Sequence, residues 1–116
     1  MAFDPSRLDR TLHEPVRLAI ASLLASRPEA TFTELRDLLG VTDGNLSVHL
    51  HALDEAGYVS VSKEFVARRP RTTARLSRRG RAALERHLDA LEEIVRSARA
   101  GHEPEARPAR RASKGR

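Results

Sequence analysis

Apolar residues recur at helical spacing at the beginning of the chain. Leu8 and Leu12 lie one turn apart and predict a short lead-in helix over residues 4–13. The apolar positions from Val16 to Leu24 predict a longer helix that begins at Pro15, because a proline costs little in the first helical turn. The chain therefore begins with helices rather than strands.

A short second helix is predicted next. Leu35, Leu38 and Leu39 form the apolar face of a helix of about two turns. We expect Thr33 to be its N-cap and Gly40 its C-terminal stop. Acidic residues near its beginning suit the positive end of the helix dipole.

The third helix has an apolar face and a polar face. Leu46, Leu50 and Leu53 follow the i, i+4, i+7 spacing and predict the face that packs on the core. Thr42 is the expected N-cap, and Gly57 ends the helix. The opposite face carries polar and small side chains, so this helix presents a polar and nearly uncharged surface to solvent.

A period of two replaces the helical period after the third helix. Residues 58–63 alternate and predict a strand, and residues 72–76 predict its return strand. Residues 64–71 hold a proline and several arginines and predict the hairpin tip. Ser77 then caps a long helix that ends at about residue 100. The apolar pattern stops there, so we expect residues 101–116 to form a disordered basic tail.

Composition limits the fold and the chemistry. The 116 residues suit one domain, and with three Phe, one Tyr and no Trp the core must consist of aliphatic residues, which favours a mainly α fold. The absence of cysteine excludes disulfides, thiolate metal sites and cysteine nucleophiles. The beginning of the chain does not resemble a signal peptide, and no apolar stretch approaches the roughly 20 residues that span a bilayer. We therefore expect a cytoplasmic protein without a membrane partner.

The charge is unevenly distributed. The net charge is +5, yet residues 1–62 hold five Lys and Arg residues against nine Asp and Glu residues. Residues 63–81 hold eight Lys and Arg residues against Glu64 alone. A basic block of this density at a predicted hairpin favours a polyanionic partner.

The third helix and the hairpin together suggest double-stranded DNA as that partner. A helix held by its apolar face can place its polar face in a major groove about 12 Å wide, while arginines of a hairpin contact phosphates or a minor groove. The helix and its amide end supply the candidates Thr42, Asp43, Gly44, Asn45, Ser47, Val48 and His51. The hairpin supplies the candidates Lys63, Arg68, Arg69, Arg71 and Arg75.

Three segments carry a family resemblance. The stretch from Phe32 to Leu50, with its Gly-Asn-Leu-Ser turn, resembles the helix-turn-helix of MarR/ArsR-type winged-helix regulators. Residues 53–59 resemble the exit from their recognition helix, and residues 76–84 resemble the step from the wing into the last helix. The likeness covers roughly residues 12–96 and implies a winged helix-turn-helix: a mainly α domain over residues 1–100 with a small β-hairpin wing.

The resemblance also implies a homodimer that binds a partly palindromic operator, usually as a repressor. It places four of the candidates on the DNA-reading helix and three arginines in the wing, namely Asn45, Ser47, Val48, His51, Arg68, Arg69 and Arg71. The last helix, about 78–100, is long enough to dimerise as well as to pack on its own domain. We expect its interface to use Leu84, Leu88, Leu91, Ile94 and Val95. The sequence identifies no small-molecule effector.

Three alternatives remain open. Winged helices also serve as protein-interaction modules, although the arginines of the hairpin favour DNA. Some ArsR-like sensors bind metal through His and carboxylates, for which His87, Asp89 and His102 are the candidates here. Enzyme activity is the weakest alternative, because no phosphate-binding glycine loop or nucleophile elbow is present. We expect no catalytic residue and no cofactor.

Overall fold

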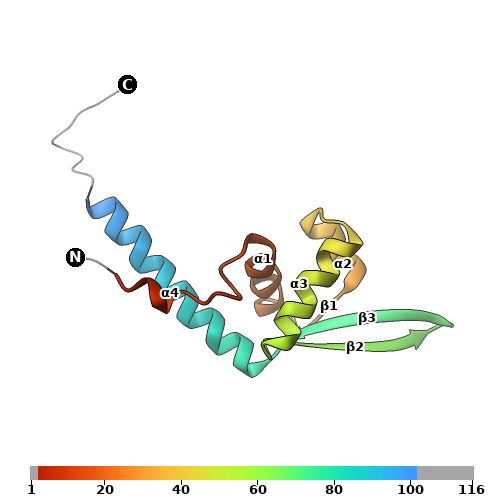
Figure 1. Cartoon of the computed structure of the whole chain (residues 1–116). Coiled ribbons are helices and arrows are strands. Elements are labelled where there is room, and N and C mark those ends of the chain that lie inside the picture. The colour runs from red at the N-terminus through yellow and green to blue at the C-terminus, as the bar shows by residue number, and fades with distance from the viewer. Residues whose placement is uncertain (1–2, 102–116) are drawn as a thin grey trace, which may run out of the picture.

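The computed structural model describes residues 3–101. Four helices surround the base of a small antiparallel sheet whose hairpin projects away from the helices (Figure 1). In chain order the elements are a 3-10 turn (Pro5–Arg7), α1 (Pro15–Ala25), β1 (Ala30–Thr31), α2 (Phe32–Leu39), α3 (Asp43–Glu55), β2 (Val59–Val66), β3 (Arg69–Leu76) and α4 (Arg78–Ala100). Among the residues from 3 to 101, no helix is long and apolar enough to cross a membrane.

Aliphatic side chains from every helix meet in one core. Its fully buried members come from the N-terminal segment and from α1, α2 and α3: Leu12, Ile20, Leu24, Leu35, Leu46 and Leu53. Val59 and Ala74 close the core from the base of the sheet, and Ala83 and Leu84 close it from α4. The core thus lies at one end of the hairpin and beside the first half of α4.

The sheet has the order β1-β3-β2, and all its pairs are antiparallel. β1 pairs only with Thr73 and Ala74, so the rest of β3 has β2 as its single neighbour. The outer half of the hairpin, beyond Lys63 and Thr72, is exposed on both strands. We call the whole β2–β3 hairpin the wing.

The wing ends in a tighter turn than the sequence predicts. Only Ala67 and Arg68 connect the strands, with φ angles of 52° and 67°. Two central residues in the left-handed region are typical of a type I′ turn, whose twist matches that of the strands. The predicted tip over residues 64–71 is therefore too long. Pro70 lies within β3 opposite Phe65, where β3 is an edge strand and its missing N–H is tolerated.

Two predictions about the helices are wrong, namely the length of the lead-in helix and the N-cap of the second helix. The lead-in helix is limited to the 3-10 turn at Pro5–Arg7. Asp9 keeps the residues that follow out of a regular helix, because its carboxylate accepts hydrogen bonds from Leu12 N and from the Tyr58 hydroxyl. The N-cap of α2 is Thr31 and not Thr33. Thr31 Oγ1 accepts from Glu34 N at 3.1 Å, and the Glu34 carboxylate accepts from Thr31 N at 2.8 Å, so the two residues form a capping box.

α4 begins against the backbone of Tyr58. Ser77 is its N-cap, as predicted, and Ser77 N donates to Tyr58 O at 2.9 Å. Gly80 in the first turn packs so closely that a Cβ there would lie 2.1 Å from the same carbonyl oxygen. The absence of a side chain at Gly80 therefore sets the distance between α4 and the start of the wing.

A buried histidine joins the N-terminal segment to α4. His87 is fully buried, and its Nδ1 accepts a hydrogen bond from Asp9 N at 3.0 Å. Its Nε2 is also buried and has no hydrogen-bond partner within residues 3–101. Burial lowers the pKa of His87, the neighbouring His13 lowers it further, and Asp9 acts in the opposite direction. The folded protein therefore favours the neutral imidazole.

Gly80→Ala is expected to lower the free energy of unfolding by about 2–3 kcal/mol, because the new methyl group must displace the Tyr58 backbone or α4. Chemical denaturation measures this change. Gly44→Ala is the matched control: no heavy atom lies within 4 Å of that Cβ, and alanine favours a helix, so its stability stays equal or rises. Equal losses in both variants would contradict the proposed packing.

Stability is expected to fall as the pH drops below about 6.5, the ordinary pKa of histidine, because the unfolded chain then binds a proton that folded His87 excludes. Above that pH the contribution is complete. One proton changes the free energy of unfolding by at most about 1.4 kcal/mol per pH unit.

Denaturation of the wild type and of His87→Asn between pH 5 and 8 tests this expectation. Asparagine keeps an acceptor for Asp9 N but does not titrate, so the variant should lose that part of the slope. An NMR titration of the wild-type imidazoles provides a readout that does not depend on the variant's fold. A His87 that titrates at or above its ordinary pKa would refute the interpretation.

Candidate nucleic-acid interface

The apolar face of α3 determines which of its side chains reach solvent. Leu46, Leu50 and Leu53 are buried, and Thr42 caps the helix by accepting a hydrogen bond from Asn45 N at 3.1 Å. The residues predicted to contact DNA bases lie on the opposite side of the helix, and all of them are exposed: Asn45, Ser47, Val48 and His51. Val48 is 65% exposed although it is apolar, so this face offers an amide, a hydroxyl, an imidazole and an aliphatic group to a partner.

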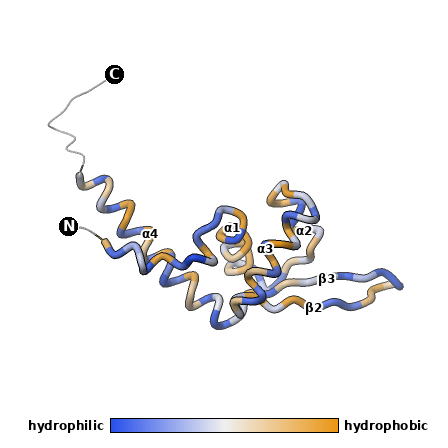
Figure 2. Tube along the Cα trace, in the orientation of Figure 1, coloured by the Kyte–Doolittle hydropathy of each residue, from blue (hydrophilic) through white to orange (hydrophobic). Residues whose placement is uncertain are grey.

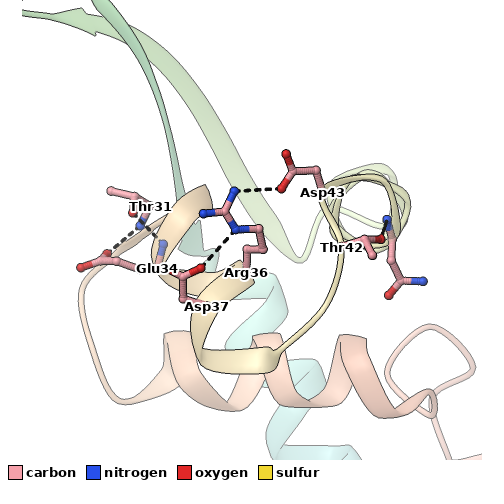
Figure 3. A network of polar contacts seen from close by, with 7 residues as sticks. Thr31, Glu34, Arg36, Asp37, Thr42 and Asp43 are labelled. Carbon is pink, nitrogen blue, oxygen red and sulfur yellow. Dashed lines mark hydrogen bonds and ion pairs between the residues drawn. The ribbon is translucent and has the colours of Figure 1, made fainter.

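The negative charge at the beginning of α3 has a partner in α2. Arg36 donates to Asp43 at 3.0 Å through Nη1 and to Asp37 at 3.1 Å through Nε (Figure 3). At the amide end of α3 the negative charge of Asp43 would oppose an approaching phosphate. The ion pair with Arg36 offsets that charge and ties the first turn of α3 to α2.

The two histidines of α3 differ in their surroundings. His51 is exposed, and its Nε2 lies 3.6 Å from a Glu55 oxygen in the next turn. His49 lies on the flank of the core face, where Arg17 of α1 contacts its Nδ1 at 3.1 Å. His49 therefore connects α3 to α1, while His51 stays accessible.

A concave surface joins α3 to the wing. It has a volume of about 500 Å³ and is lined by side chains from α2, α3 and both long strands: Phe32, Ser47, Leu50, His51, Asp54, Val61, Lys63 and Thr72. Lys63 thus lies with Ser47 and His51 on one surface, as a joint contact with DNA requires. Asp54 adds one negative charge to it.

The register of the hairpin separates the basic residues of the wing. Paired residues share a face of the ribbon and alternate residues share it along each strand, so Lys63 lies on the face that lines the concave surface. Arg69, Arg71 and Arg75 lie on the other face, and Arg68 is in the turn. Sequence reasoning placed all five cations in the wing region but could not assign them to faces.

Arg75 differs from the other arginines of the hairpin. Its Nη2 lies 2.5 Å from a carboxylate oxygen of Glu29, just before β1. This guanidinium is therefore held at the base of the hairpin, and it is less available to phosphate than the arginines of the tip. Among the described residues, Lys63, Arg68, Arg69 and Arg71 form no ion pair.

The apolar residues of α4 lie in two places: some pack in the domain core, and others line a groove on the second half of the helix. Leu84 is buried in the domain core, so it is not available to a partner subunit, contrary to the prediction. Leu88 packs partly on the core, and Ile94 is half-buried. Leu88, Leu91 and Val95 line a groove on the second half of the helix, where Val95 is 46% exposed. The groove also has polar members, Glu92, Arg96 and Arg99, and ends at Ala100.

The candidate metal ligands do not come together. His87 is buried against Asp9 N, whereas Asp89 is exposed. His102 lies outside the described residues. Between residues 3 and 101 no group of three or more His, Asp or Glu side chains could hold a metal ion. His87 is therefore a wrong candidate, because its burial serves the packing of the N-terminal segment.

The sequence did not identify Phe65 as an exposed residue of the wing. It is 77% exposed at the outer end of β2, the largest exposure among the big apolar side chains of the described chain. In the sequence it stood within the predicted tip, where no periodicity indicated its orientation. The long strands revealed by the structure assign it to a face, opposite Pro70.

The chain is similar to known proteins over most of its length. A profile of the winged helix DNA-binding domain family matches residues 16–95. An uncharacterised protein of Methanocaldococcus jannaschii is 34% identical over 73 residues, which make up 63% of this chain and 79% of that protein. A transcriptional regulator homologue from Pyrococcus horikoshii OT3 has a similar structure, with a TM-score of 0.72 at 32% identity over 78% of this chain and 89% of that chain.

MarR has the same fold at lower identity. Its TM-score is 0.70 at 19% identity, over 82% of this chain and 69% of MarR. The predicted fold, mainly α with a hairpin wing, is confirmed, and so is the resemblance to winged-helix regulators. The chain belongs to the winged helix DNA-binding domain family.

Proposed function

We propose that this protein is a homodimeric transcriptional regulator that binds a specific double-stranded DNA sequence and represses by occupying a promoter. The observation that carries the proposal is the single surface formed by the exposed face of α3 and Lys63 of the wing. A relative of 32% identity is described as a transcriptional regulator homologue, which supports the same role.

The recognition helix is α3. Its buried leucines hold it on the core while Asn45, Ser47 and Val48 face outward. An asparagine can pair with adenine through two hydrogen bonds, a serine can contact a base edge or a phosphate, and a valine can contact the thymine methyl group. Specificity therefore comes from α3, while Lys63 and the arginines of the wing supply salt-dependent affinity.

The dimer interface is the groove on the second half of α4. This half extends away from the core, as Figure 1 shows, so its apolar residues have little of their own domain to pack against. Leu91 and Val95 would pack against the same residues of a second subunit in a two-fold arrangement. A symmetric dimer presents two α3 helices to two half-sites.

Selection of bound sequences from random duplex DNA tests the regulator at physiological salt. The wild type is expected to enrich a two-fold symmetric motif, whose half-site spacing reports the dimer. Asn45→Ala should lose the preference at one or two base pairs of each half-site and keep the rest, at a cost of about 1–3 kcal/mol per lost contact. Binding without an enriched motif would refute sequence specificity, and an unchanged Asn45→Ala motif would refute its role as a reader.

Arg69→Ala is expected to weaken binding to all DNA sequences to a similar extent. Loss of one phosphate contact should reduce the slope of log affinity against log salt by about 0.9. Fluorescence anisotropy over a range of salt concentrations measures that slope. Arg86→Ala is the matched control, since it removes the same charge from an exposed position of α4, a helix that contributes no residue to the concave surface. If the two variants have equal slopes, Arg69 does not contact phosphate.

A further inference from the structure

The wing carries an exposed apolar pair among its charges. Phe65 of β2 is 77% exposed, and its cross-strand partner in the register is Pro70 of β3. Figure 2 shows this part of β2 as a hydrophobic stretch beside a hydrophilic β3. Phe65 contributes little to its own core, so its apolar surface is available to a partner.

The backbone fixes where this pair points. Phe65 lies two positions from Lys63 and four from Val61, and both of these residues line the concave surface that includes α3. Residues two apart share a face of a ribbon, so Phe65 lies on the continuation of that face toward the tip. A DNA duplex held by α3 therefore meets the face that carries Phe65 and Pro70.

The tip is also held in one conformation. The connection has only two residues, Ala67 and Arg68, and proline restricts the backbone of β3 at the position opposite Phe65. An aromatic side chain on such a short ribbon loses little conformational freedom on binding, which favours its use as a rigid contact.

The charges around the pair identify the partner. Lys63 shares the face of the pair, Arg68 lies in the turn, and Arg69 and Arg71 lie on the other face of the same narrow ribbon. Glu64 is the only acidic side chain of the wing. Two such tips would repel each other, which disfavours a second copy of the chain as the occupant. A duplex attracts these cations and also offers an apolar space, the stacked base pairs as seen from the minor groove.

We propose that Phe65 enters the minor groove beside the site read by α3 and wedges between two base pairs, so that the wing kinks the DNA. This inference rests on the proposed DNA binding and specifies how the wing takes part in it. Apolar wedges partly unstack a base step, and pyrimidine–purine steps deform most easily. Phe65 thus makes the protein prefer TA or CA/TG steps at a position where it forms no hydrogen bond with a base.

A duplex that carries the enriched sequence, with 2-aminopurine at the step facing the wing, tests the wedge with the full-length protein. The fluorescence of 2-aminopurine rises when it is unstacked, so wild-type protein should increase it. Phe65→Ala should abolish the increase and leave the salt slope unchanged. It should also reduce affinity about tenfold, which is the order of magnitude found when an aromatic–base contact is removed. Phe65→Leu should retain part of the increase, since leucine is also an apolar wedge.

Val66→Ala is the matched control. Val66 neighbours Phe65, is 41% exposed and lies on the opposite face of the ribbon, so its loss should leave the fluorescence increase intact. Thermal unfolding of each variant shows that the fold is retained, which is expected at exposed positions.

The outcomes separate the wedge from the proposed function. If wild-type protein binds the enriched duplex with a steep salt slope but leaves the fluorescence unchanged, the wedge is refuted and the regulator stands. The same holds if Phe65→Ala increases the fluorescence as much as the wild type. If the wild type binds no duplex, both proposals fail. Self-association without DNA that disappears in Phe65→Ala would assign the tip to a protein contact and refute the wedge.

Discussion

The burial of three leucines of α3 is the interaction on which the candidate interface depends. Leu46, Leu50 and Leu53 occupy the core together with residues of α1, α2 and α4. Each fully buried leucine contributes on the order of 2 kcal/mol by removing its surface from water, so rotation of the helix about its axis would be costly. The outward direction of Asn45, Ser47 and Val48 follows from this packing alone, because none of them contributes to the core.

The other parts of the interface are positioned relative to that helix. Arg36 holds the first turn of α3 through Asp43, and Arg17 holds its middle through His49. The wing is placed less directly: Gly80 allows α4 to approach the carbonyl of Tyr58, and β2 starts at the next residue. A side chain at Gly80 would therefore displace α4 or the backbone at the start of the wing without altering any exposed residue of α3.

Much of this arrangement could be predicted from local patterns. The leucine spacing of α3, the caps Thr42 and Ser77 and the end of α2 at Gly40 are local signals, and the structure agrees with them. The face of Phe65, the pairing of Arg75 with Glu29 and the burial of His87 depend on residues distant in sequence. The lead-in helix failed for the same reason, since Asp9 is held by Tyr58 from 49 positions away. Leu84 fits both a core and an interface pattern, and periodicity alone does not distinguish them.

The turn at the tip of the wing has an unusual composition for its shape. A type I′ turn favours Asn-Gly, whereas this chain has Ala67 and Arg68, and each left-handed residue of this kind costs on the order of 1 kcal/mol. The ribbon is thus less stable than an Asn-Gly hairpin would be, and in exchange it carries a guanidinium at its outermost position.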